Sequence, residues 1–201
     1  FTGLYAVIAI QAALIHRANT GEGQHIDCAL LDSAVGILAN QAMNHLVGGV
    51  VPVPLGNSHP NVVPYRTFAA RDGHVIVAVG NDGQFRALCD ALGRDDLRDH
   101  PDYARNELRV RNRTVLEAAL EDEISRHDGA ALIALMEARG VPGGPINRID
   151  AVFTDPHVIA RKMQVSVKTP GGDRVPQLRF PPVMSASPAT IRRAPRSPSA
   201  T

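Results

Sequence analysis

The chain opens on an apolar segment, TGLYAVIAIQAALIHRANTG at residues 2–21, which limits the possible folds more than any other part of the sequence. Its apolar residues occupy nearly every side of a helix, and such a helix belongs in the interior of a protein. The run is too short to span a bilayer, contains Gln11 and His16, and lacks the flanking features of a signal peptide. Because the first residue is Phe1 rather than methionine, we expect the chain to begin inside a longer polypeptide.

The composition is that of an ordinary globular protein, with 44% hydrophobic and 20% charged residues among 201. The formal net charge of +1 argues against a nucleic-acid partner and against binding to a membrane surface. Cys28 and Cys89 each lie in an apolar pattern and suggest no disulfide framework, so we expect a reducing, cytoplasmic environment. The eight histidines are scattered without metal-ligand spacing, so we expect no metal site.

The first fifty residues favour a helix, a strand and a second helix, as in one part of an α/β layer. The first helix should end within the stretch NTGEG, where a glycine can adopt the left-handed conformation that closes a helix. The segment QHIDCAL, residues 24–30, alternates apolar and polar side chains and predicts a strand. Residues 31–49 predict one helix, with Asp32 or Ser33 as its N-cap.

Residues 48–66 are rich in glycine and proline and predict a linker between two domains. The stretch GNSHP, residues 56–60, is either a plain connection or a loop shaped to lie over a site. His59 in this stretch is correspondingly either a base or ligand contact, or a solvated side chain. Tyr65 is expected to anchor the loop onto the domain that follows.

The region after the linker predicts a β-hairpin and then a well-delimited helix. Asp72-Gly73 is a strong two-residue turn signal between two runs of β-forming residues. The helix should begin after the N-cap Asn81, with Gln84 reaching back toward it, and should end at Gly93. Its apolar positions recur at helical spacing and predict four buried residues: Phe85, Leu88, Cys89 and Leu92.

The rest of the sequence predicts further helices, a second hairpin and a tail. Two helices are expected at about residues 111–127 and 129–139, the second of them closed by a turn-rich VPGGPIN stretch. Residues 148–163 predict two short helices split at an Asp-Pro pair, and residues 164–180 predict a hairpin around two glycines. Residues 188–201 have the composition of a disordered tail.

Asp82 is the acidic residue most worth considering as a functional group. It lies at a strand-to-helix junction, where the helix dipole favours negative charge and where active-site groups often occur. The alternative is that Asn81 or Asp82 simply caps the helix. The surrounding GNDGQF lacks both the glycine spacing of a dinucleotide site and the lysine of a P-loop, so the phosphate-site signal is weak.

Four segments, taken in order, resemble the C-terminal portion of the family III CoA-transferases of the CaiB/BaiF type. They are TGLYAVIAIQAALIHRANTGEGQHIDCALLDSA, GNSHPNVVPYRTFAARDGHVIVAVGNDGQFRALCDALG, NELRVRNRTVLEAALEDEI and LIALMEARGVPGGPINRIDAVFTDPHVIARKM. The resemblance covers nearly the whole chain, and the ordered set is more specific than any single motif. The family also includes formyl-CoA and carnitine-CoA transferases and the α-methylacyl-CoA racemases.

This resemblance implies an α/β protein that forms an interlocked homodimer, with a Rossmann-like large domain built from both chain ends and a smaller α/β domain between them. Residues 1–47 would be part of the large domain, and residues 48–66 the linker. Residues 67–145 would be the small domain, and residues 146–187 would return to the large domain, before the tail.

The resemblance also implies the chemistry, in which an aspartate attacks an acyl-CoA thioester. In the family this aspartate lies just upstream of the TGLYA-type helix, which places it immediately before Phe1 and leaves no catalytic residue within the chain. An aspartyl-CoA thioester would then pass its CoA to a carboxylic acid. The CoA thioester is a substrate here, and no cofactor is implied.

The resemblance implies six candidates for the substrate pocket: Gly56, Asn57, His59, Tyr65, Asn81 and Asp82. A plain linker remains the alternative for the first three. Racemases of the family tend to have a glutamate where Asp82 stands, so we prefer the transferase and keep an α-methylacyl-CoA racemase as the alternative. A non-catalytic truncated copy is a third possibility, and without the aspartate the chain alone is expected to be inactive.

Overall fold

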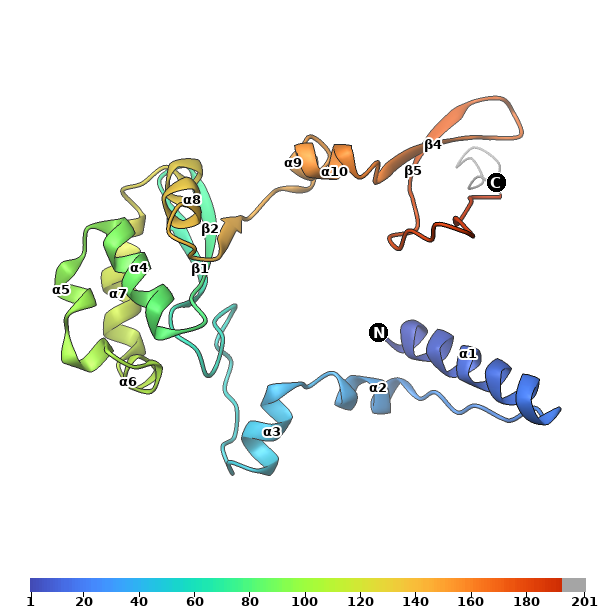
Figure 1. Cartoon of the computed structure of the whole chain (residues 1–201), viewed down its shortest axis with the longest axis horizontal. Helices are drawn as coiled ribbons and strands as arrows, with labels where there is room; N and C mark the ends of the chain where they lie inside the picture. Colours follow the sequence, from blue (N-terminus) through green and yellow to red (C-terminus); the bar gives the residue numbers. More distant parts are fainter. Residues whose placement is uncertain (193–201) are drawn as a thin grey trace. The chain divides into compact units, whose positions relative to one another are not determined.

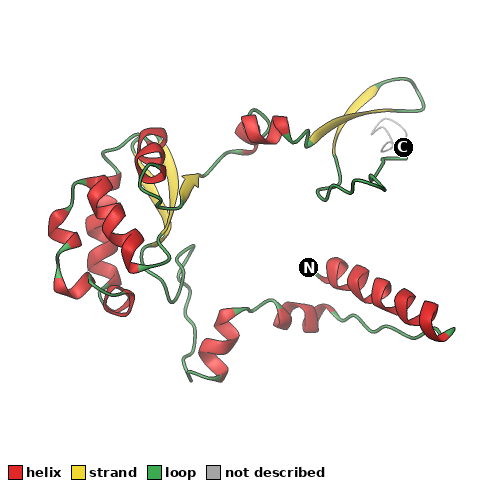
Figure 2. Ribbon diagram, in the orientation of Figure 1, coloured by secondary structure: helices red, strands yellow, loops and turns green. Residues whose placement is uncertain are grey.

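The computed structural model describes residues 1–192, and the chain divides into two units, Phe1–Val62 and Val63–Thr201 (Figure 1). The division falls within the segment predicted as a linker, residues 48–66, and the predicted domain bounds stay predictions. The part of the predicted tail beyond residue 192 lies outside the described residues. Helices and strands occur together in the second unit, in keeping with the predicted α/β class (Figure 2).

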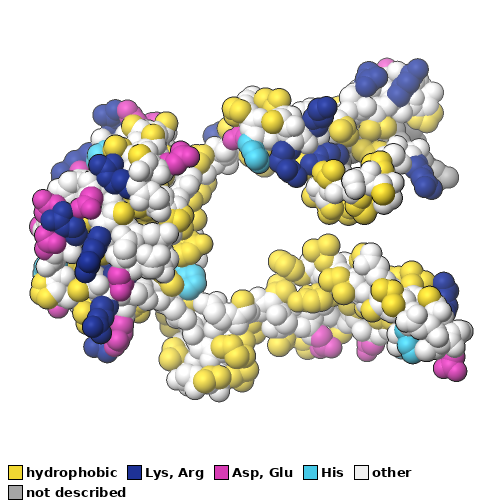
Figure 3. Space-filling model, viewed as in Figure 1, with side chains coloured by type: hydrophobic (Ala, Val, Ile, Leu, Met, Phe, Trp, Pro, Cys, Tyr) yellow, Lys and Arg dark blue, Asp and Glu magenta, His cyan; other side chains and the backbone are white. Residues whose placement is uncertain are grey.

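The first unit contains three helices joined by extended segments: α1 (Thr2–Thr20), α2 (Leu30–Gly36) and α3 (Asn40–Leu46). The end of α1 is as predicted, because Gly21 has a left-handed φ of 80° and donates its N–H to the carbonyl of Arg17 at 2.9 Å. Within the described part of the chain no residue of α1 is buried, and Figure 3 shows hydrophobic side chains on its surface. No helix among residues 1–192 has the length and apolar content to cross a membrane.

The prediction of a strand at residues 24–30 is wrong, because the structure has no strand in this segment. The alternation is nevertheless visible, because Ile26 and Cys28 are partly covered while His25 and Asp27 are exposed. A strand needs a neighbour to satisfy its backbone N–H and C=O groups. No described strand pairs with this segment, so it remains extended without forming a ladder.

The single helix predicted at residues 31–49 is also wrong, because the segment is divided between α2 and α3. The break follows Gly36 and includes Ala39, whose φ of 50° is unusual for a residue with a side chain. The N-cap of α2 is Ala29, so Asp32 lies in the first turn and Ser33 bonds back to the carbonyl of Ala29 at 3.0 Å. The apolar residues keep their helical spacing across this break, so the break could not be predicted from the sequence.

The second unit is built around a three-stranded antiparallel sheet in the order β1-β2-β3: β1 (Tyr65–Ala70), β2 (Gly73–Ala78) and β3 (Gly143–Pro145). The predicted hairpin is confirmed, but its loop residues are Arg71 and Asp72, because Ala70 pairs with Gly73. Asp72 instead accepts a hydrogen bond from the N–H of Gly129, at 2.8 Å, and so caps a later helix.

The short strand β3 was not predicted, since its sequence carries only turn signals. It pairs with β2 through Ile76 and Gly144, and the chain approaches its neighbours closely at Gly143. A Cβ added to Gly143 would lie 2.0 Å from the Cε of Met136 and 2.7 Å from the carbonyl oxygen of Ile76. Only glycine fits at this position without displacing the surrounding atoms.

The helices between β2 and β3 are α4 (Asp82–Leu92), α5 (Asp95–Arg98), the 3-10 helix η1 (Pro101–Tyr103), α6 (Asn106–Arg111), α7 (Arg113–Ile124) and α8 (Gly129–Glu137). Of these, α7 contacts β1, and α8 contacts β2 and β3. Helix α4 is confirmed in detail, because it buries the four predicted apolar residues and ends at Gly93 with a φ of 65°. The predicted helices at 111–127 and 129–139 are confirmed as the shorter α7 and α8. The small helices α5, η1 and α6 were not predicted.

All buried apolar residues of the described chain lie between Val63 and Val141, so the hydrophobic core belongs to the second unit. The outer edge of β1 is tied to the segment around α7. The N–H of Ala69 donates to Glu121 Oε1 at 2.9 Å, and that of Arg71 donates to the carbonyl of His127 at 2.9 Å. These bonds satisfy backbone groups that the sheet ladder leaves open.

The remaining described elements are α9 (Ile149–Val152), α10 (Pro156–Ala160), β4 (Gln164–Lys168) and β5 (Arg174–Leu178). They confirm the predicted pair of short helices and the second hairpin, in which β4 and β5 are antiparallel. Asp155 caps α10 by accepting the N–H of His157 at 2.8 Å. Residues 188–192 carry neither helix nor strand.

Candidate functional site

The pocket residues predicted from the sequence fall in both units. Gly56, Asn57 and His59 belong to the first unit, while Tyr65 and the Asn81–Asp82 pair belong to the second. Each group has its own local geometry.

The group in the first unit lies in a loop with defined internal hydrogen bonds. Gly56 has a left-handed φ of 61°, and the turn beside it is closed by the N–H of Ser58, which donates to the carbonyl of Leu55 at 3.1 Å. The Nδ1 of His59 accepts the N–H of Asn61 at 3.1 Å. This bond ties the imidazole ring to the backbone two residues further along the same loop.

The group in the second unit lies at one end of the β1–β2 hairpin. Tyr65, the first residue of β1, is paired in register with Ala78, the last residue of β2. The N–H of Val79 donates to the carbonyl of Pro64 at 3.0 Å, which extends the pairing by one step. The chain then continues to Asn81, the residue before α4. The end of β2 therefore lies next to the start of α4.

Asn81 is the residue that caps α4, as one of the two sequence interpretations held. Its Oδ1 accepts the N–H of Gln84 at 2.9 Å. The side chain of Gln84 does reach back, but its Oε1 accepts the N–H of Gly80 at 2.7 Å rather than that of Asn81. The turn from β2 into α4 is therefore held from both sides.

Asp82 does not cap its own helix, and its hydrogen-bond partners lie in α6 instead. Its Oδ1 accepts a hydrogen bond from Arg109 Nη2 at 2.8 Å and from the N–H of Asn106 at 3.0 Å. The Arg109 side chain is fully buried, whereas that of Asp82 is 48% exposed. Asp82 thus joins the start of α4 to the start of α6, and one edge of its carboxylate still faces solvent.

Sequence reasoning missed Arg109 and Asn106, which hold this end of the unit together. Both lie in the short helix α6, where an arginine between apolar residues is most simply taken as a solvated side chain. No spacing in the sequence distinguishes a buried arginine from an exposed one.

Cys89, which the sequence placed in the core, is completely buried on the inner face of α4. Burial raises the pKa of its thiol to about 12, and the neighbouring Asp90 acts in the same direction. The thiolate is therefore scarce at neutral pH, and Cys89 does not serve as a nucleophile.

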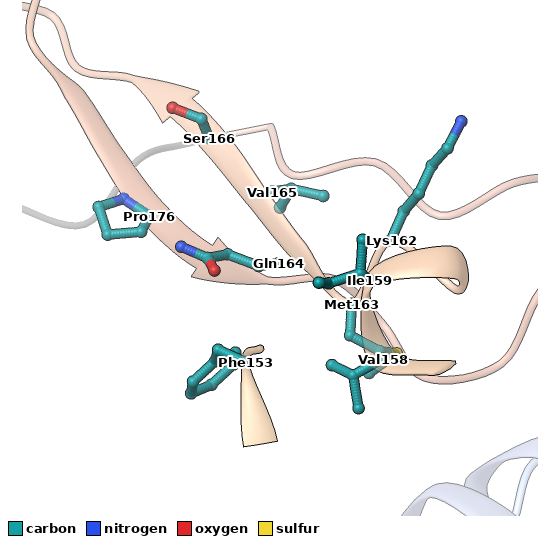
Figure 4. A pocket seen from close by; sticks show the side chains of 9 residues that line it. All are labelled: Phe153, Val158, Ile159, Lys162, Met163, Gln164, Val165, Ser166 and Pro176. Carbon is teal, nitrogen blue, oxygen red and sulfur yellow. The ribbon is translucent and has the colours of Figure 1, made fainter. Parts of the chain in front are cut away.

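A hollow between α10 and the β4–β5 hairpin is lined by none of the predicted pocket residues (Figure 4). Apolar side chains, among them Phe153 and Met163, form most of its lining, and Lys162 stands at its rim. Within residues 1–192 no group of three or more His, Cys, Asp or Glu side chains could hold a metal ion.

Asn81→Ala is expected to lower the free energy of unfolding of the second unit by about 1 kcal/mol, because the N–H of Gln84 loses its acceptor. Urea denaturation followed by circular dichroism measures the change. Asn81→Ser is the matched control, since serine also caps helices and should retain most of the stability. Equal losses in the two variants would contradict the capping role.

Comparisons of the chain with family models, with known proteins and with solved structures agree with one another. A family model described as CoA-transferase family III matches residues 1–200. The chain is 46% identical over 193 residues to a succinate–glutarate CoA-transferase of Agrobacterium fabrum, with 96% of this chain and 48% of that protein covered. It is 38% identical over 174 residues to a succinyl-CoA:mesaconate CoA-transferase of Haloarcula marismortui, covering 86% of this chain and 43% of that protein.

A crystal structure of a CAIB/BAIF family protein from Brucella suis is also similar, with 48% identity and a TM-score of 0.76. The match covers 98% of this chain and 51% of that chain. The chain thus spans about half the length of the relatives that it matches.

Proposed function

The chain belongs to CoA-transferase family III, and on this premise we propose that it is part of an enzyme that moves CoA from an acyl-CoA thioester to a free carboxylic acid. The observation that carries the proposal is the match of residues 1–200 to the family model. The 46% identity to a succinate–glutarate CoA-transferase supports the same conclusion.

The proposed substrates are short dicarboxylic acids, with succinyl-CoA as the donor. The two relatives described above are named for succinate with glutarate and for succinyl-CoA with mesaconate. Succinate, glutarate and mesaconate all carry two carboxyl groups, of which one becomes the thioester and the other stays charged. The pocket must therefore hold a second carboxylate away from the reacting atoms.

The proposed reaction uses an aspartate that precedes Phe1 in the complete polypeptide. Its carboxylate attacks the donor thioester, forms a mixed anhydride and releases CoA thiolate. The thiolate attacks the aspartyl carbonyl, releases the donor acid and leaves an aspartyl-CoA thioester. The acceptor carboxylate then attacks this thioester, and the thiolate, released again, takes the acceptor acyl group and regenerates the aspartate.

The residues of this chain would shape the pocket rather than perform the acyl transfer. His59 is taken as a contact to the acceptor carboxylate, from the loop in which its Nδ1 accepts the N–H of Asn61. Asp82 stands where racemases of the family tend to have a glutamate, and its Oδ1 accepts hydrogen bonds from Arg109 and from the N–H of Asn106. A carboxylate one methylene shorter than that glutamate favours the transferase over a racemase that would use this position as an acid or base.

The assembly proposed is a homodimer of the complete polypeptide, interlocked as the family resemblance implies. Helix α1 supports such an arrangement, because apolar side chains such as Leu4 and Ile8 are 66% and 61% exposed. A helix with this composition is stable when other elements cover it.

The function is tested with the complete polypeptide, succinyl-CoA and either glutarate or mesaconate. We expect the acceptor's CoA thioester to form with ping-pong kinetics, and His59→Ala to raise the acceptor KM by roughly 10-fold through loss of a contact in the acid pocket. His74→Ala, which removes an exposed histidine of β2, is the matched control and should leave KM unchanged.

Other outcomes would contradict the proposal. Exchange of the α-hydrogen of a 2-methylacyl-CoA in deuterated water, without any acceptor acid, would indicate a racemase instead. If His59→Ala and Asn57→Ala both left KM and kcat unchanged, residues 56–60 would be a plain linker. A complete polypeptide without an acidic residue before Phe1 would rule out the aspartyl-CoA step.

A further inference from the structure

Arg109 forms the centre of a buried polar network in the second unit. Its side chain is fully buried, and its guanidinium lies 4.5 Å from the centre of the Phe85 ring. Its Nε donates to the carbonyl of Val63 at 2.8 Å, and its Nη1 donates to the carbonyl of Tyr103 at 2.9 Å. Its Nη2 donates to Asp82 Oδ1 at 2.8 Å.

The same network holds the other backbone group of Val63. The Oδ1 of Asn106 accepts the N–H of Val63 at 3.1 Å, and the N–H of Asn106 donates to Asp82 at 3.0 Å. Val63 is the first residue of the second unit and lies two residues before Tyr65. Both of its backbone polar groups are thus fixed by side chains of α6.

Burying an arginine in a core costs free energy, because its charged group loses its hydration. Its desolvation offsets much of the attraction to a carboxylate, and apolar residues of similar volume often give equal or greater stability. What arginine supplies is a rigid planar fork that holds several acceptors at fixed positions. Arg109 uses this fork on acceptors from three segments far apart in the sequence: Val63, Tyr103 and Asp82.

We propose that Arg109 is a positioning residue of the acid-binding pocket. By holding Val63 and Asp82 together, it sets the placement of Tyr65 at the start of β1 against the Asn81–Asp82 turn at the start of α4. The inference rests on the proposed function, because it takes Tyr65, Asn81 and Asp82 as pocket residues. Arg109 itself, being buried, touches no substrate.

The test uses the complete polypeptide with Arg109→Lys, which keeps the charge but loses the planar fork. We expect KM for both succinyl-CoA and the acceptor acid to rise roughly 10-fold, with a smaller change in kcat, because small displacements of pocket groups weaken binding steeply. Asn106→Ala, which removes the acceptor for the N–H of Val63, should act in the same direction.

Leu132→Ala provides the matched control for a purely structural effect. Leu132 is a fully buried residue of α8, so its truncation destabilises the core without touching the network. We expect this variant to lose stability but to keep the wild-type KM for both substrates. Hydrogen exchange gives a readout independent of activity, and the amide of Val63 should exchange faster in Arg109→Lys and Asn106→Ala but not in Leu132→Ala.

The outcomes separate the inference from the proposed function. If the wild-type polypeptide transfers no CoA between these acids, the proposed function fails, and unchanged exchange at Val63 in Arg109→Lys would overturn the positioning role by itself. If the wild type is active, folded Arg109→Lys and Asn106→Ala variants whose KM stays within about twofold of the wild type would overturn the inference. A KM increase of similar size in Leu132→Ala would overturn it as well.

Discussion

A fragment of residues 63–147 is expected to unfold in a single cooperative transition, with a free energy of unfolding on the order of 5 kcal/mol. The reason is that every buried apolar residue of the described chain lies between Val63 and Val141. The fragment also keeps the whole three-stranded sheet and the helices from α4 to α8. Urea denaturation followed by circular dichroism and by amide hydrogen exchange measures the transition.

A fragment of residues 1–62 is the contrasting case and should show no cooperative transition. Ser33 is its single buried residue, and its helices have no described partner that covers their apolar sides. Isolated helices as short as α2 and α3 are marginal in water, and the exposed apolar side chains of α1 promote self-association. A sharp transition from the 1–62 fragment, or a non-cooperative one from 63–147, would contradict this division of stability.

Gly143→Ala is expected to destabilise the second unit by about 3 kcal/mol, at the upper end of the usual cost of overpacking. The new Cβ would meet the Cε of Met136 at 2.0 Å and the carbonyl oxygen of Ile76 at 2.7 Å. The methionine side chain can move, but the Ile76 carbonyl belongs to the backbone of β2. The variant should therefore displace β3 from the sheet, which faster exchange of the amides around β3 would reveal.

Gly144→Ala is the matched control for this prediction. It lies next to Gly143 in the same strand, yet a Cβ at Gly144 would meet no atom within 4 Å. Neither glycine has a positive φ, so the two substitutions differ in steric contact and not in backbone strain. Similar losses of stability in both variants would show that steric contact at Gly143 is not the cause.

The elements that could be predicted from the sequence are those whose signals are local. Helix α4 carries its own N-cap in Asn81, its own apolar stripe and a closing Gly93, and all three features lie within thirteen residues of chain. The same holds for the β1–β2 hairpin and for the end of α1 at Gly21. For these features the local sequence preferences agree with the fold as a whole.

The elements that could not be predicted depend on partners distant in sequence. β3 exists because β2, some sixty-five residues earlier, accepts it as a neighbour, although its own sequence carries only turn signals. Residues 24–30 show the converse, since their pattern suits a strand but no described strand pairs with them. At the candidate site Asp82 could be singled out from the sequence, but Arg109 could not, because its partners come from three other segments: the chain at Val63, helix α4 and the chain at Tyr103.

The two margins of the three-stranded sheet restrict how copies of this protein can associate. One margin, β3, has three residues and ends in Pro145, which has no N–H to offer an incoming strand. Along the other, the outward amides of Ala69 and Arg71 are already taken by Glu121 and by the carbonyl of His127. This sheet is therefore a poor template for strand addition, and any chain that bound to the second unit would have to be recognised through side chains.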